Sequence, residues 1–174
     1  MDEGAAVMAQ SQQDGCRIIE ALQRYLPDPA ATARAGALLA PGLRGGMVVT
    51  LSGELGVGKT TLVRGLLRAL GWTGPVKSPS YALVEHYPIS RLYFYHFDFY
   101  RLNDATEWDT TGFAELFRSD TVGLIEWPEH VAGRLPSVDV AVRLWHAEPG
   151  RTLSCQAGTA AGRACLDAFS SPLQ

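Results

Sequence analysis

Residues 53–60 match the motif of a phosphate-binding loop. Their sequence, Gly-Glu-Leu-Gly-Val-Gly-Lys-Thr, satisfies the pattern G-x-x-x-x-G-K-[ST] at every fixed position. The glycines let backbone N–H groups converge on phosphate oxygens, and a helix that follows adds the positive end of its dipole. Lys59 supplies a positive charge for the β- and γ-phosphates, and the Thr60 hydroxyl is a ligand for Mg²⁺. The motif predicts that the chain binds a nucleoside triphosphate.

Nucleotide hydrolysis also needs carboxylates that hold Mg²⁺ and orient water, and two acids lie at the ends of predicted strands. The first is Glu126, which follows the apolar run at residues 122–125. In open α/β sheets ligands bind at the carboxyl ends of the strands, so we expect Glu126 to face the phosphates. The second is Asp98, in the segment His-Phe-Asp-Phe-Tyr-Arg at residues 96–101. We interpret Asp98 as an acid that positions water or metal.

Two other polar residues of this segment have less specific interpretations. Strand alternation places His96 on the same face as Asp98, with the phenylalanines of the segment on the other face. A histidine on a strand more often forms a structural hydrogen bond than acts in catalysis, and we favour that role for His96. Arg101 either pairs with an acid or reaches phosphate, and the sequence leaves both interpretations open.

The segments that flank the loop are those that the motif requires. Residues 47–51 form a short β-branched run that predicts a buried strand. Residues 61–70 have apolar side chains at helical spacing, and Gly71 ends this helix. A strand, a glycine loop and a helix in this order are the context in which the motif binds phosphate.

The remaining elements follow from periodicity and from helix-start and turn residues. Upstream, residues 18–26 predict a short amphipathic helix that Pro27 ends, and Asp28 with Pro29 predicts the start of a second helix that runs toward Pro41. The downstream predictions are strands 81–87 and 92–99 joined by a turn at 88–91, a capping box at Asp104 and Glu107, a helical turn at 113–117, a strand at 121–127, paired strands at 138–145 and 151–156, and a helix at 160–169.

These elements predict an α/β fold. We expect the three-layer sandwich of P-loop NTPases, with a mixed, mainly parallel sheet to which the hairpin and the C-terminal strand pair add antiparallel strands. Residues 1–28 are predicted to be a partly disordered N-terminal extension, and residues 29–174 a single P-loop ATPase domain.

Composition narrows the possible partners and the compartment. The 174 residues are 47% hydrophobic, which is enough for a continuous core without disulfides or structural metals. The net charge of −3 argues against DNA binding and against direct binding of RNA through a broad basic surface. Three cysteines without a C-x-x-C pair favour reduced thiols in a cytoplasmic protein. We see no signal peptide and no apolar run long enough for a membrane span.

Three other functions can be compared with ATP hydrolysis. Residues 109–112 match D-x-x-G, but no N-K-x-D segment for guanine recognition is present, which makes a GTPase a weak interpretation. A small-molecule kinase usually closes an arginine-rich lid over the nucleotide. The candidate lid here, residues 103–120, contains a single arginine, Arg118. The kinase remains an alternative, as does a non-catalytic scaffold that changes shape with the bound nucleotide.

Four ordered blocks make residues 32–151 resemble the TsaE family, the small ATPases of N6-threonylcarbamoyladenosine synthesis on bacterial tRNA. The blocks are residues 53–61, 78–81, 96–101 and 126–128, and the last three are far more specific than a phosphate loop alone. The resemblance implies that ATP or ADP and Mg²⁺ bind, and that the 78–81 loop is a nucleotide-dependent switch. The sequence departs from the family pattern at Ser80, a position where family members commonly have threonine.

The resemblance also implies roles for individual residues and for partners. Asp98 and Glu126 would be catalytic, and Thr60 and Glu126 would hold the metal. The nucleotide would be bound by Glu54, Leu55, Gly56, Val57, Gly58, Lys59, Thr60, Thr61 and Trp127. The partner would be the TsaB–TsaD heterodimer, with tRNA contacted indirectly through that complex. ATP hydrolysis would be slow in the isolated chain and coupled to these partners.

Overall fold

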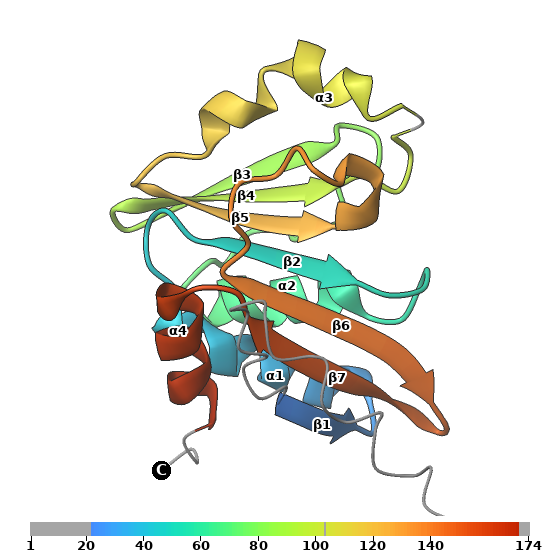
Figure 1. Cartoon of the computed structure of the whole chain (residues 1–174). Coiled ribbons are helices and arrows are strands. Elements are labelled where there is room, and N and C mark those ends of the chain that lie inside the picture. Colours follow the sequence, from blue (N-terminus) through green and yellow to red (C-terminus); the bar gives the residue numbers. More distant parts are fainter. Residues whose placement is uncertain (1–21, 103, 171–174) are drawn as a thin grey trace, which may run out of the picture.

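The computed structural model describes residues 22–102 and 104–170, which form a seven-stranded sheet flanked by helices (Figure 1). The strands are β1 (Leu22–Leu26), β2 (Val48–Ser52), β3 (Val84–Ile89), β4 (Leu92–Asp98), β5 (Thr121–Glu126), β6 (Val140–Ala147) and β7 (Gly150–Ala157). The α-helices are α1 (Pro29–Leu39), α2 (Lys59–Ala69), α3 (Thr106–Thr111) and α4 (Ala160–Ser170). Short 3₁₀ helices are η1 (Ala40–Gly42), η2 (Phe113–Leu116) and η3 (Pro128–Val131).

The sheet is mixed, with a parallel centre. Its strand order is β1-β7-β6-β2-β5-β4-β3, and β2 lies between β6 and β5 and runs parallel to both. β4 is parallel to β5, whereas the β3–β4, β6–β7 and β1–β7 pairs are antiparallel. The predicted α/β fold with a mainly parallel sheet is therefore confirmed, including the hairpin and the C-terminal strand pair.

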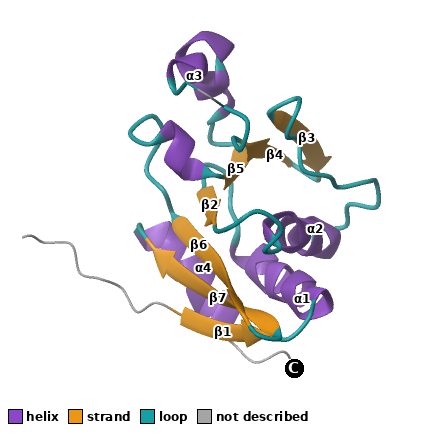
Figure 2. Ribbon diagram, turned by 90° about the vertical axis from the view of Figure 1, so that its right-hand side faces the viewer, coloured by secondary structure: helices purple, strands orange, loops and turns teal. Residues whose placement is uncertain are grey.

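Helices α1 and α2 lie side by side against one face of the sheet (Figure 2). Their backbones approach closely because glycines face each other's helix: a Cβ added at Gly65 would lie 2.0 Å from the Ala33 carbonyl oxygen, and one at Gly36 would lie 2.0 Å from that of Leu62. This contact fixes the position of α2, and the N-terminus of α2 carries Lys59.

The opposite face is covered over β4 and β5 by an aromatic cluster. Phe97 lies face to face with Phe117, with ring centroids 5.6 Å apart, and Phe99 meets the edge of Trp108 at 5.6 Å. Phe97 and Phe99 are fully buried, and alternation along β4 therefore turns His96 and Asp98 to the face on which α2 packs.

The predicted helix at residues 18–26 is wrong. Residues 22–26 form β1, which pairs with β7 in the register Leu22↔Cys155 to Leu26↔Arg151, and residues 18–21 lie outside the described part of the chain. Exposure alternates along β1 with the period of a strand. The free hydrogen-bonding edge of β7 therefore overrides the helical spacing of three apolar residues in this short segment.

Smaller corrections concern element boundaries. β3 begins at Val84 rather than at Tyr81, since Leu83 has a left-handed backbone with φ of 63°. β3 continues to Ile89, so the hairpin turn is shorter than predicted. The predicted capping box does not form, because the Asp104 carboxylate accepts from the Thr106 N–H at 2.8 Å and the helix begins after it. These differences leave the order of elements unchanged.

The predicted start of the second helix is confirmed. Asp28 is the N-cap of α1 and accepts from the Ala31 N–H at 2.6 Å, with Pro29 in the first turn. Cys155 and Cys165 are buried free thiols, and Cys16 lies outside the described residues. Among the helices of the described segments, none combines the length and the apolar character that crossing a membrane requires.

Candidate nucleotide site

The phosphate-binding motif forms the loop between β2 and α2, as predicted. Gly53 and Gly58 have φ of 137° and 117°, values that an L side chain rarely adopts. A Cβ at Gly53 would also lie 2.2 Å from the Leu144 carbonyl oxygen. The glycine conformation therefore lets the loop turn directly from the strand into the N-terminus of α2, which begins at Lys59.

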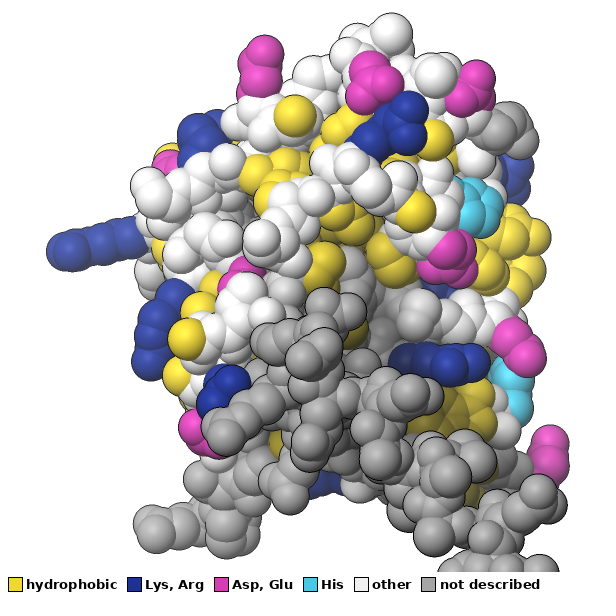
Figure 3. Space-filling view, viewed as in Figure 1, with side chains coloured by type: hydrophobic (Ala, Val, Ile, Leu, Met, Phe, Trp, Pro, Cys, Tyr) yellow, Lys and Arg dark blue, Asp and Glu magenta, His cyan; other side chains and the backbone are white. Residues whose placement is uncertain are grey.

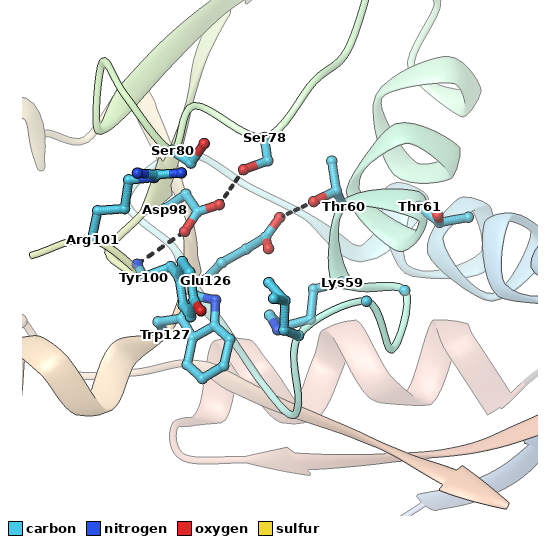
Figure 4. A pocket seen from close by; sticks show the side chains of 13 residues that line it. Lys59, Thr60, Thr61, Ser78, Ser80, Asp98, Tyr100, Arg101, Glu126 and Trp127 are labelled. Carbon is cyan, nitrogen blue, oxygen red and sulfur yellow. Dashed lines mark hydrogen bonds between the residues drawn. The ribbon is translucent and has the colours of Figure 1, made fainter.

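This loop borders a cavity of about 340 Å³ (Figure 4). The cavity brings together predicted site residues from three segments, namely the loop with the start of α2, the end of β4 and the end of β5. The predicted residues in its lining are Leu55, Gly56, Gly58, Lys59, Thr60, Thr61, Asp98, Glu126 and Trp127. Ser78, Ser80, Tyr100 and Arg101 complete it.

Two predicted nucleotide-binding residues do not line the cavity. The Val57 side chain is fully buried, and its carbonyl accepts from Arg151 Nη1 at 3.2 Å. Glu54 is exposed, with its carboxylate 3.8 Å from His146 Nε2. Their backbone groups still belong to the phosphate loop. The Glu54 carbonyl, for example, accepts a hydrogen bond from Lys59 Nζ at 3.0 Å.

Lys59 is held in place by its own loop. Its Nζ donates to the carbonyls of Gly53 at 2.7 Å and Glu54 at 3.0 Å, and it lies 4.1 Å from the centre of the Trp127 ring. Burial lowers the Lys59 pKa from its usual value, and the negative charges of Glu126, Asp98 and Glu129 partly oppose this effect. The ammonium group is thus presented at the loop with few water contacts, where a phosphate would favour its charged form.

Glu126 is linked to the start of α2. Its Oε1 accepts from the Thr60 hydroxyl at 2.7 Å and also lies 2.9 Å from His96 Nε2. Glu126 and His96 are almost fully buried, and both project toward α2 from neighbouring strands. The hydroxyl and the carboxylate are hard oxygen donors of the kind that Mg²⁺ prefers.

The chemistry of these donors fits Mg²⁺ in a phosphate-binding site. Within residues 22–102 and 104–170 no cluster of three or more His, Cys, Asp or Glu side chains could hold a metal alone. Mg²⁺ commonly takes only one or two protein oxygens and completes its octahedron with water and substrate phosphates. Thr60 and Glu126 match that requirement beside the loop that would bring the phosphates.

Asp98 is positioned by contacts on both of its carboxylate oxygens. Oδ2 accepts from the Ser78 hydroxyl, and Oδ1 accepts from the Tyr100 N–H at 3.0 Å (Figure 4). The β4–β5 register places Asp98 directly beside Glu126. The two acids predicted from separate segments therefore lie at the same edge of the sheet, next to Lys59.

Aromatic and basic side chains surround the mouth of the cavity. Trp127 has a left-handed backbone with φ of 58°, which sends its ring toward Lys59, and it packs against Tyr100 with centroids 5.0 Å apart. Arg101 lies 4.4 Å from the centre of the exposed Tyr81 ring. Among the described residues Arg101 forms no ion pair with an acid, so the interpretation that it reaches phosphate stays a prediction.

Among the contacts of the site that sequence reasoning missed, two join distant parts of the chain. One is the buried link from His96 to Glu126, and the other is the contact of Arg151, on β7, with the phosphate loop. Both depend on strand order and register, for which the chain carries no local signal. The alternation that places His96 and Asp98 on one face of the strand was the only sign of the His96–Glu126 contact.

Comparisons with known proteins give matches over most of the chain. The family model "Threonylcarbamoyl adenosine biosynthesis protein TsaE" matches residues 26–153. The chain is similar to "tRNA threonylcarbamoyladenosine biosynthesis protein TsaE" of Haemophilus influenzae, at 40% identity over 157 residues that cover 87% of this chain and 99% of that protein. A Synechocystis protein of the same description is 38% identical over 120 residues, which cover 67% of this chain and 75% of that protein. The crystal structure of Bacillus subtilis YdiB superposes with a TM-score of 0.76 at 26% identity, covering 88% of this chain and 97% of that one.

Proposed function

Because the chain belongs to the TsaE family, whose members take part in tRNA threonylcarbamoyladenosine biosynthesis, we propose that it is a Mg²⁺-dependent ATPase that serves as an accessory subunit of that modification. The observation that carries the proposal is the convergence of Lys59, Thr60 and Glu126 on one cavity, with Asp98 beside them. A phosphate loop alone accounts for nucleotide binding, whereas the two acids supply what hydrolysis needs in addition.

Each side chain has a distinct role in the proposed reaction. The loop N–H groups and Lys59 bind the phosphates and draw off the negative charge that develops on them. Thr60 and Glu126 would hold Mg²⁺, which would supply positive charge to neutralise the phosphates. Asp98, fixed by Ser78 and the backbone of Tyr100, orients the attacking water. The Trp127 ring lies over the ammonium of Lys59 and limits its contact with water.

The geometry favours ATP hydrolysis over transfer of phosphate to a metabolite. Arg118, the lone arginine of the candidate kinase lid, pairs with Asp120 at 3.1 Å on the exposed surface and does not line the cavity. A lid without an arginine at the phosphates lacks the group that usually stabilises the transferred phosphoryl in such kinases. The proposed acceptor is therefore water.

We further propose that the partner is the TsaB–TsaD pair and that tRNA is reached through it. Basic and acidic side chains are interspersed on the described part of the face in Figure 3, and the chain has a net charge of −3. Binding of nucleic acid through phosphate contacts alone calls for a clustered basic surface. A complex that carries the tRNA on another subunit removes that requirement.

The test is ATP hydrolysis by the purified chain with and without the TsaB–TsaD pair, together with modification of tRNA. We expect slow hydrolysis alone, stimulation by the pair, and loss of both activities in Glu126→Gln. No binding to the pair in either ATP or ADP would reject the accessory role. Full tRNA modification by an Asp98→Asn variant that no longer hydrolyses ATP would favour the non-catalytic scaffold instead.

A further inference from the structure

His96 is a fully buried histidine with one polar partner. It lies on β4, two residues before Asp98, and its exposed fraction is 0%. Nε2 is 2.9 Å from Glu126 Oε1, and both side chains are inaccessible or nearly so. Nδ1 is also buried and has no hydrogen-bond partner.

The contact with Glu126 bears on which nitrogen of His96 carries the proton. Opposite an ionised Glu126, which only accepts hydrogen bonds, the neutral ring would donate from Nε2. Nδ1 then remains a bare acceptor in the core, which is unfavourable without a partner. A histidine that served the core alone would be expected to satisfy both nitrogens or to be replaced by an apolar side chain. Because Nε2 is the one ring nitrogen with a hydrogen-bond partner, the role of His96 is best explained by its contact with the Glu126 carboxylate.

The same carboxylate oxygen receives a second donor. Glu126 Oε1 also accepts from the Thr60 hydroxyl at 2.7 Å, and neither bond uses Oε2. Two donors from different elements, β4 and the N-terminus of α2, thus fix the rotation of one carboxylate. This is the arrangement by which outer-shell groups orient a metal-binding carboxylate.

We propose that His96 is a positioning residue, which holds Glu126 through an Nε2–H···Oε1 hydrogen bond so that the carboxylate and Thr60 together bind the metal that accompanies the nucleotide. This inference depends on the proposed function, because it assigns His96 to the metal side of that site. His96 does not line the nucleotide cavity, so removing its donor should affect metal binding more than nucleotide binding.

The experiment compares two amides that differ in reach. In His96→Gln the side-chain nitrogen can occupy the place of Nε2, whereas in His96→Asn it is too short to reach Glu126. His96→Met fills the site without a donor. Phe94→Leu is the matched packing control, because Phe94 is buried on the same strand and the same face but belongs to the apolar core. Each variant is tested for ADP binding in EDTA, for Mn²⁺ binding by electron paramagnetic resonance with ADP present, and for thermal unfolding.

We expect His96→Asn and His96→Met to lower Mn²⁺ affinity by about 10- to 100-fold, the usual effect of removing an outer-shell partner. ADP binding in EDTA should persist, which also shows that a variant is folded. His96→Gln should recover most of the Mn²⁺ affinity, and Phe94→Leu should lower the unfolding temperature without weakening Mn²⁺ binding.

Two results would overturn the inference. One is wild-type Mn²⁺ affinity in His96→Asn. The other is an equal loss in His96→Gln and His96→Asn, which would make the effect one of packing. If the wild-type chain binds no nucleotide, the proposed function fails as well. If it binds and hydrolyses ATP and only the histidine variants behave as wild type, the positioning role alone is rejected.

Discussion

Replacing Lys59 by methionine should separate nucleotide binding from folding. Methionine keeps most of the apolar stem of lysine and removes the ammonium, which donates to two loop carbonyls and lies over Trp127. On binding, the ammonium would exchange those carbonyls for phosphate oxygens in a poorly hydrated site. A charge-assisted hydrogen bond of this kind contributes about 1.5–3 kcal/mol. The dissociation constant should therefore rise roughly 10- to 150-fold, at about 1.4 kcal/mol for each factor of ten.

The unfolding free energy of the same variant without nucleotide should change little. Burial disfavours the cation in the folded protein, and the two residues whose carbonyls it contacts are not buried, Gly53 being half-buried and Glu54 exposed. The pKa of Lys59 is lowered on balance, so burial disfavours the cation more than the nearby acids favour it, and losing the charge should not destabilise the fold. Isothermal titration calorimetry with ATP and urea unfolding measure the two effects. Lys77→Met is the control, because it removes the same charge from the other lysine of the chain, which is exposed. Unchanged ATP affinity in folded Lys59→Met would refute the placement of the phosphates at this loop.

Three further predictions concern pH, packing and thiol chemistry. Burial lowers the pKa of Lys59 in the free protein, and bound phosphate should raise it. Between these two pKa values nucleotide binding should therefore take up a proton and weaken as pH rises. Calorimetry in buffers of different ionisation enthalpy should detect this proton uptake in the wild type and not in Lys59→Arg. Gly65→Ala should destabilise the protein by about 1–3 kcal/mol in urea, since its Cβ would meet the Ala33 carbonyl, whereas helix propensity alone predicts stabilisation by about 1 kcal/mol. Burial raises the pKa of Cys155 to about 12 and of Cys165 to about 11. In a Cys16→Ser variant at pH 8, a disulfide reagent should therefore react with these two thiols only after unfolding. Rapid reaction of the native variant would contradict their burial.

Local chemistry made much of the fold predictable. The Asp28 cap with Pro29, the strand and helix around residues 53–60, and the apolar strand that ends at Glu126 are each defined by residues close together in the chain. The error at residues 22–26 has the opposite origin. That segment is too short for its apolar spacing to distinguish a helix from a strand, and its structure is decided by hydrogen bonds to β7, more than a hundred residues away.

The site was predictable to a similar extent. Lys59, Thr60, Asp98 and Glu126 were identified one by one from motif and strand position, and the structure places them around one cavity. The bonds that orient the two acids were not identified, because they join residues on different strands and loops. The Ser78 hydroxyl that donates to Asp98 lies in a loop whose path no periodicity describes.

The placement of the acids depends on the aromatic cluster behind them. β4 pairs with β5 so that Asp98 lies beside Glu126, and a slip of one residue would turn every β4 side chain to the opposite face. Such a slip would move Phe97 and Phe99 out of their cluster with Trp108 and expose their rings on the side of the phosphate loop. The large apolar area of these rings therefore fixes the register, and the register in turn keeps the carboxylates at the nucleotide cavity. By this reasoning, truncation of Phe97 should impair the site even though its side chain points away from it.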